Sequence, residues 1–231
     1  MAATSLIAAS WLVLAVWSLS PFAEWLDHAE MKHIDAAPAI RQGVFILGWT
    51  LMITAMMLPG TLLLLARCLN NEPWSTRHLL PLVVPYLVVW AAFGSVSYWG
   101  DTGLHEFVEH HSAVAGAIAP GVLLLAGIYQ LTPMKRVCLA QCRLEGTAFA
   151  ALTQPGKHNL WITGLRHGLY CLGSCWALML LMFALGGVNL LWMLVLGVIM
   201  TVERLSRRGD TVTQGLGVVL VTVSALWIIV G

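Results

Sequence analysis

The chain has 231 residues, of which 59% are hydrophobic and only 10% are charged, and its formal net charge is +1. Soluble domains carry roughly 25% charged residues, so this composition excludes a soluble fold, and the near-zero charge argues against nucleic acid as a partner. The apolar stretches are continuous, and helices satisfy their own backbone hydrogen bonds in lipid. The sequence therefore predicts an all-α, polytopic transmembrane helix bundle.

A helix needs about 20 apolar residues to cross the hydrocarbon core of a membrane. About seven stretches reach this length, and we expect residues 1–231 to form a single integral membrane domain. No Lys or Arg precedes the first stretch, which is typical of a retained span rather than a signal peptide. The predicted spans are residues 3–23, 43–66, 79–99, 114–132, 164–185, 188–205 and 212–230.

The distribution of Lys and Arg predicts the orientation. With the N-terminus inside and the C-terminus outside, only Lys32 and Arg41 fall in outer loops. This partition follows the positive-inside rule and predicts a multi-pass protein of an inner, cytoplasmic-type membrane. The other ten of the twelve basic residues then lie on the inner side: Arg67, Arg77, Lys135, Arg136, Arg143, Lys157, Arg166, Arg204, Arg207 and Arg208.

Two outer loops are rich in His and acidic residues. The first includes His28 and His33, and the second carries a denser cluster. Imidazole and carboxylate groups one helical turn apart suit Zn, Cu or Fe, which makes the second cluster a candidate capture site. The alternative is an interfacial helix whose polar face is merely solvated. The candidate ligands of the second cluster are His105, Glu109, His110 and His111.

The inner loop after the fourth span contains Cys138 and Cys142, which would share one face of a helix beside Lys135, Arg136 and Arg143. Nearby cations favour the thiolate, which is the form that binds metals. Two cysteines supply only half of a tetrahedral site. The alternative is a basic amphipathic helix that lies on anionic lipid.

The fifth predicted span carries the strongest chemical pattern. Five potential ligands lie along one stripe of the helix, mostly at i, i+4 steps: His167, Cys171, Cys175, Met179 and Met182. Imidazole, thiol and thioether groups on one face are soft ligands of the kind that Cu(I) prefers. The competing interpretation is close helix packing, because the same span contains several small residues, among them Gly164, Gly168, Gly173 and Ser174.

Neighbouring spans contribute weaker patterns. The sixth span places Asn189, Met193, Met200 and Glu203 within one narrow face. Glu203, near the inner end of the span, could bind a cation or pair with Arg204 or Arg207. The favoured alternative is a carboxylate that merely reaches the interface. Three methionines of the second span, Met52, Met56 and Met57, are expected to fill the core.

Several blocks of this sequence resemble a family of predicted metal-binding integral membrane proteins, whose members are often labelled domains of unknown function and sometimes copper chaperones. The blocks are Ala55–Pro59, Tyr129–Lys135 with Cys138 and Cys142, Cys171–Met179, and Asn189–Met193. Their order and spacing cover the second span and the fourth to sixth spans. The resemblance implies a metal-handling function and favours copper.

The chain departs from the family pattern at three positions. Ser174 stands where the family tends to have a second Cys, Val188 where it tends to have Met, and Arg204 where Lys is usual. With one thiol and one thioether fewer, the resemblance implies either a site with fewer soft ligands or a chain adapted to another task.

Together these patterns favour a membrane protein that binds copper for delivery or transport and that is not an enzyme. Its expected partners are membrane lipid and either a cuproprotein client or another membrane protein. The alternative is an accessory subunit without bound metal, which packs against partner helices and against lipid or pigment cofactors. A haem or quinone protein ranks last, because the His residues lie at span ends. No arrangement typical of a hydrolase stands out.

Overall fold

The computed structural model describes residues 2–20, 36–68, 76–110, 112–151, 160–184, 189–206 and 208–230. Within these ranges the fold is all-helical, which confirms the predicted fold class. The eight helices of the described residues are α1 (Ala2–Ser18), α3 (Pro38–Cys68), α4 (Thr76–His110), α5 (Ser112–Leu131), α6 (Pro133–Ala151), α7 (Leu160–Ala184), α8 (Leu190–Leu205) and α9 (Gly209–Val230).

Every predicted span coincides with one helix, whereas the number of membrane crossings stays a prediction. Within the described residues, four stretches are long and apolar enough to cross a membrane: Pro38–Thr61, Leu80–Val108, Leu160–Met182 and Gly209–Val230. The number rises to five if α5 and α6 form one bent span. The apolar stretch Ile7–Ser18 of α1 is shorter, and α8 has only 16 residues.

A sharp bend separates α5 from α6 and turns the chain by 64°. Thr132 lies at the bend, donates its hydroxyl to the Tyr129 carbonyl at 2.7 Å and accepts the backbone N–H of Lys135 at 3.3 Å. Pro133 follows as the first residue of α6, a position that tolerates the missing N–H of proline. The chain thus leaves α5 and starts a new helix with its first turn capped.

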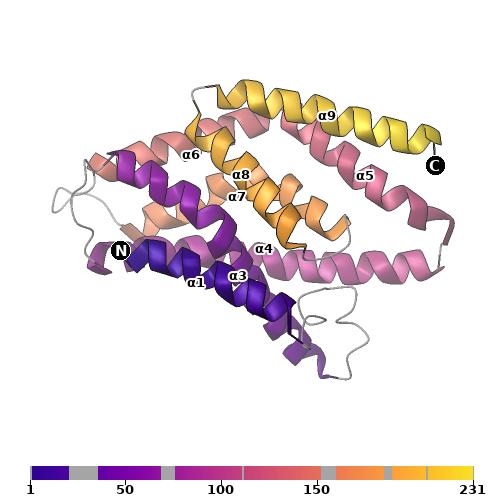
Figure 1. The fold of residues 1–231 in the computed structure, drawn as a ribbon, viewed down its shortest axis with the longest axis horizontal. Coiled ribbons are helices and arrows are strands. Elements are labelled where there is room, and N and C mark those ends of the chain that lie inside the picture. The colour runs from indigo at the N-terminus through magenta and orange to yellow at the C-terminus, as the bar shows by residue number, and fades with distance from the viewer. Residues whose placement is uncertain are drawn as a thin grey trace.

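The helices pack as neighbours in pairs (Figure 1). Helix α9 lies along α5 at one edge, and α1 lies along α3 at the opposite edge. Between these edges, α7 packs against α4, α5 and α6, while α8 packs against α3. The core between the pairs is rich in tryptophan and methionine, and its buried side chains include Trp49, Trp90 and seven methionines. Those methionines are Met52, Met56, Met57, Met179, Met182, Met193 and Met200.

Helix α6 buries one face in the bundle and exposes the other, so contact with lipid stays a prediction for the exposed face. It packs against α3, α7 and α8, and the side chain of Lys135 is fully buried. Arg136 remains exposed. A basic residue that turns into the bundle needs a buried partner, and the structure supplies one from α8, described below.

Candidate metal site

Helix α7 buries its whole ligand stripe. All five predicted ligands on this helix are at most 5% exposed. The i, i+4 spacing places them on one side, and that side faces the interior of the bundle. Burial alone does not distinguish a metal site from packing, so the partners of each side chain decide what the stripe can do.

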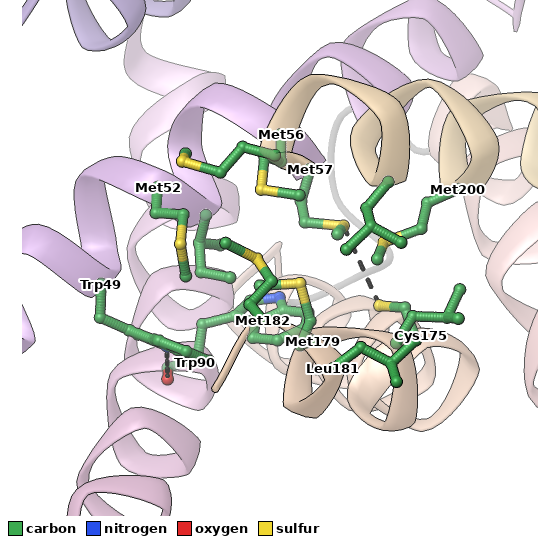
Figure 2. Close-up of a cluster of buried hydrophobic side chains, with 14 of the residues drawn as sticks. Trp49, Met52, Met56, Met57, Trp90, Cys175, Met179, Leu181, Met182 and Met200 are labelled. Atoms are coloured by element: carbon green, nitrogen blue, oxygen red, sulfur yellow. Dashed lines mark hydrogen bonds between the residues drawn. The ribbon is translucent and has the colours of Figure 1, made fainter. Parts of the chain in front are cut away.

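The two thiols of α7 face sulfur and positive charge. Cys175 Sγ lies 3.9 Å from Met57 Sδ of α3, as the dashed line in Figure 2 shows. A single nitrogen of the Arg204 guanidinium, Nη2, lies 2.9 Å from Cys171 Sγ, 3.4 Å from Cys175 Sγ and 3.3 Å from Met57 Sδ. Three sulfurs from two helices therefore converge on one point, which the cation of α8 reaches.

This donor set fits a soft monovalent ion. Two thiols and one thioether are ligands that Cu(I) accepts and that hard ions such as Mg²⁺ avoid. Within the described residues, no three His, Cys, Asp or Glu side chains lie close enough together to hold a metal ion. The sulfur cluster has only two such residues, and its third donor belongs to a methionine. The candidate centre is therefore a thiol–thioether site.

Tyr86 and His167 form a second layer around the thiols. The Tyr86 hydroxyl lies 3.2 Å from Cys171 Sγ, and the Tyr86 and His167 rings stack with centroids 5.8 Å apart. His167 Nε2 lies 3.3 Å from Thr61 Oγ1, a contact that directs this nitrogen toward α3. His167 therefore borders the sulfur cluster through Tyr86, and its Nε2 faces the hydroxyl of Thr61.

Met179 and Met182 continue the stripe away from the thiols. Figure 2 shows them on the side of Met52 and Trp90, whereas Cys175 faces Met57. Both methionines are buried in the methionine-rich core. The structure thus places the predicted thioethers in the same core, one or two turns beyond the point where the sulfurs converge.

Cys138 and Cys142 of α6 occupy different surroundings. Cys142 is 1% exposed and belongs to the same buried cluster as Cys171 and Cys175, so it lies at the edge of the sulfur site. Cys138 is half-buried and faces Gly173, where an added Cβ would lie 2.8 Å from its Sγ. The two thiols therefore share a helix face, but only Cys142 approaches the site.

The cations expected to favour thiolates on α6 are paired with other groups. Lys135 Nζ donates to Glu203 Oε2 at 2.9 Å, and the Gln130 amide donates to Glu203 Oε1 at 3.2 Å. Arg143 donates to the Glu203 carbonyl and forms an ion pair with Asp210 at 3.4 Å. The expectation that Glu203 reaches the interface is wrong, because it is 2% exposed and its carboxylate accepts from Lys135 of α6 and Gln130 of α5.

Two glycines of α7, Gly164 and Gly168, act in helix packing. Each precedes one of the two thiols by seven residues, so the glycines share the thiol face of the helix two turns earlier. An ideal Cβ at Gly164 would lie 2.5 Å from the Leu82 carbonyl oxygen, and one at Gly168 would lie 3.2 Å from Val89 Cβ. These glycines let α4 and α7 approach closely. Both interpretations of this span therefore find a structural counterpart on one face, the packing glycines in the first turns and the thiols two turns later.

The predicted outer capture site is only partly visible. His110 is exposed, and its Nδ1 lies 2.7 Å from the Glu106 carbonyl. His111, the side chains of His105 and Glu109, and the first outer cluster with His28 and His33 lie outside the described residues. The capture site therefore stays a prediction.

Sequence reasoning missed the contributions of Met57, Tyr86 and Arg204. Met57 was assigned to the core together with Met52 and Met56, and Arg204 was treated as part of an inner charged end. Both approach the thiols from helices that are distant in sequence: 118 residues separate Met57 from Cys175. Met57 differs from Met52 and Met56 in lying one turn before Thr61, on the face of α3 that contacts α7. The sequence alone does not show which face that is.

One known protein family matches most of the chain. Residues 46–227 match the family model described as PpoB2, copper chaperone. The chain belongs to this copper chaperone family. The matched range contains the sulfur cluster, Arg204 and the buried Lys135–Glu203 pair. No curated protein and no solved structure matched the chain.

Proposed function

We propose that this protein binds Cu(I) at Cys171, Cys175 and Met57 and carries it for delivery to a cuproprotein client or for transport. The observation that carries the proposal is the convergence of three sulfurs, since all three lie within 3.4 Å of Arg204 Nη2. A single ion at that point would contact two thiolates and a thioether. Membership of a copper chaperone family supports copper as the ion.

The proposed route has an outer and an inner end. Outer His and carboxylate groups around His110 would capture the ion, and the thioethers of Met179 and Met182 would line its way to the thiols. Cys142, with Cys138 behind it on α6, would receive the ion on the inner side. The position of Cys142 at the edge of the cluster supports this last step.

We further infer seven crossings of an inner membrane, with the N-terminus inside and the C-terminus outside. The ten-to-two partition of basic residues supports this topology. The described helices also expose large apolar side chains on their outward faces, as lipid contact requires, including Val218, Leu226 and Ile229 of α9. The protein would bind and pass on its ion without catalysing a reaction.

Copper binding by purified variants tests the proposal. The full chain is purified in mild detergent, loaded with Cu(I) under reducing conditions and titrated with a chromophoric Cu(I) chelator. Cys171→Ser or Cys175→Ser should remove most of the bound copper. Met57→Leu should weaken binding by about tenfold, which corresponds to about 1.4 kcal/mol.

Met56 provides the matched control, because it is one residue away and as buried as Met57. Its side chain lies beside Gly197 of α8, whereas the sulfur contact to Cys175 is made by Met57. Met56→Leu should leave Cu(I) affinity unchanged. Full copper stoichiometry in both Ser variants, or equal effects of the two Met replacements, would contradict the proposed site.

A further inference from the structure

Arg204 is a buried cation without a carboxylate partner in the described part of the chain. It lies in the last turn of α8 with 4% of its side chain exposed. Its neighbour Glu203 is engaged by Lys135, and that pair is electrically neutral by itself. The guanidinium instead donates to sulfur, since Nη2 lies 2.9 Å from Cys171 Sγ. Its positive charge is therefore directed at the thiols.

The charges of the site can be summed for each type of ion. Thiol ligands bind metals as thiolates, so Cys171 and Cys175 contribute two negative charges, Met57 contributes none and Arg204 contributes one positive charge. A monovalent ion makes the loaded site neutral. A divalent ion leaves one positive charge, which is costly to keep in a buried, low-dielectric environment.

From this balance we propose that Arg204 is the fixed countercharge of the site and that it selects a monovalent ion over a divalent one. The inference rests on the proposed Cu(I) site and assigns it a residue that determines specificity without being a ligand. A guanidinium suits this role because it stays protonated in proteins and can direct several N–H groups at neighbouring sulfurs.

The side chain has room to yield the point on which the sulfurs converge. Gly60 of α3 lies beside Arg204, and even an added Cβ there would remain 3.8 Å from both Cδ and Nη1. For an ion to enter, the guanidinium would shift toward this methyl-sized space while its charge stays next to the thiolates. Arg204 would occupy the centre of the site before loading and neutralise it afterwards.

The electrostatic effect of removing the charge differs between the two classes of ion. Loss of Arg204 removes an attraction to two thiolates and a repulsion from the metal. For a monovalent ion the attraction exceeds the repulsion, so affinity falls. For a divalent ion the two effects nearly cancel. Unit charges about 4 Å apart in a partly polar site interact strongly enough to change affinity by about a hundredfold or more.

The experiment compares Ag(I), a redox-stable monovalent probe, with Zn(II) as the divalent probe on the full chain in detergent. Arg204→Gln and Arg204→Met remove the charge, and Arg204→Lys keeps it. In either neutral variant, Ag(I) affinity should fall by about a hundredfold and Zn(II) affinity should change by less than about tenfold. Arg204→Lys should keep the wild-type ratio of the two affinities.

Each outcome decides the question. A wild-type protein that does not bind Ag(I) contradicts the proposed function itself. If the wild type binds Ag(I), the ratio of Ag(I) to Zn(II) affinity in the variants tests the countercharge. An unchanged ratio in a folded neutral variant overturns it. A ratio that falls as far in Arg204→Lys as in the neutral variants also overturns it. Circular dichroism and size-exclusion chromatography establish folding. If neither neutral variant folds, the ratio in Arg204→Lys decides alone.

Discussion

The buried pair between Lys135 and Glu203 should be one of the strongest single links in the bundle. The side chains are 0% and 2% exposed, and Nζ lies 2.9 Å from Oε2. Among the described residues, Lys135→Met leaves Glu203 with the Gln130 amide as its one side-chain donor. Glu203→Gln leaves the Lys135 ammonium without its counter-ion. Removing one partner of a buried pair costs about 3–5 kcal/mol, because an uncompensated charge stays buried.

The assay is unfolding of the purified protein in detergent, followed by circular dichroism. A loss of this size in a chain of 150–250 residues lowers Tm by about 10 °C. The double variant Lys135→Met, Glu203→Gln should lose much less than the sum of the single variants, because no charge is left uncompensated. Asp210→Asn is the control, since its pair with Arg143 is largely solvated and should be worth at most about 1 kcal/mol. Additive effects of the two single replacements would refute the reasoning.

Two further predictions concern packing and topology. Gly164→Ala should destabilise the bundle by about 1–3 kcal/mol, because its Cβ would meet the Leu82 carbonyl at 2.5 Å. Gly121→Ala is the control and should stabilise the bundle by up to about 1 kcal/mol, because a Cβ there would have nothing within 4 Å. A higher Tm for the Gly164 variant would contradict the close approach of α4 and α7. A reporter that works only on the outer side of the membrane should be active when it is fused to the C-terminus. Activity of a reporter that works only in the cytoplasm would overturn the predicted orientation.

The helices could be predicted from the sequence because apolar length is a local property. All seven predicted spans coincide with helices, and the errors lie at their ends. Helix α4 runs to His110 although its predicted span ends at residue 99, and α3 begins at Pro38 rather than at residue 43. In both cases polar residues extend the helix beyond the apolar run. Hydropathy therefore predicts the length of the apolar run and not the full length of the helix.

The candidate site could be predicted only as far as a single helix determines it. The i, i+4 spacing of Cys171 and Cys175 already placed both thiols on one face of α7. The partners of that face come from other helices: Arg204 Nη2 bridges to Met57 across 147 residues of sequence. Contacts of this kind depend on how α3, α7 and α8 pack, and no local pattern records that packing.

The two interpretations of α7 turn out to depend on each other. Gly164 and Gly168 allow α4 to approach this helix, and Tyr86 lies on the part of α4 that approaches. The close packing brings the Tyr86 hydroxyl within 3.2 Å of Cys171 Sγ. A larger residue at either glycine would separate the helices and withdraw this hydroxyl from the thiol. The glycines in the first turns of α7 thus help to build the sulfur site further along the same face.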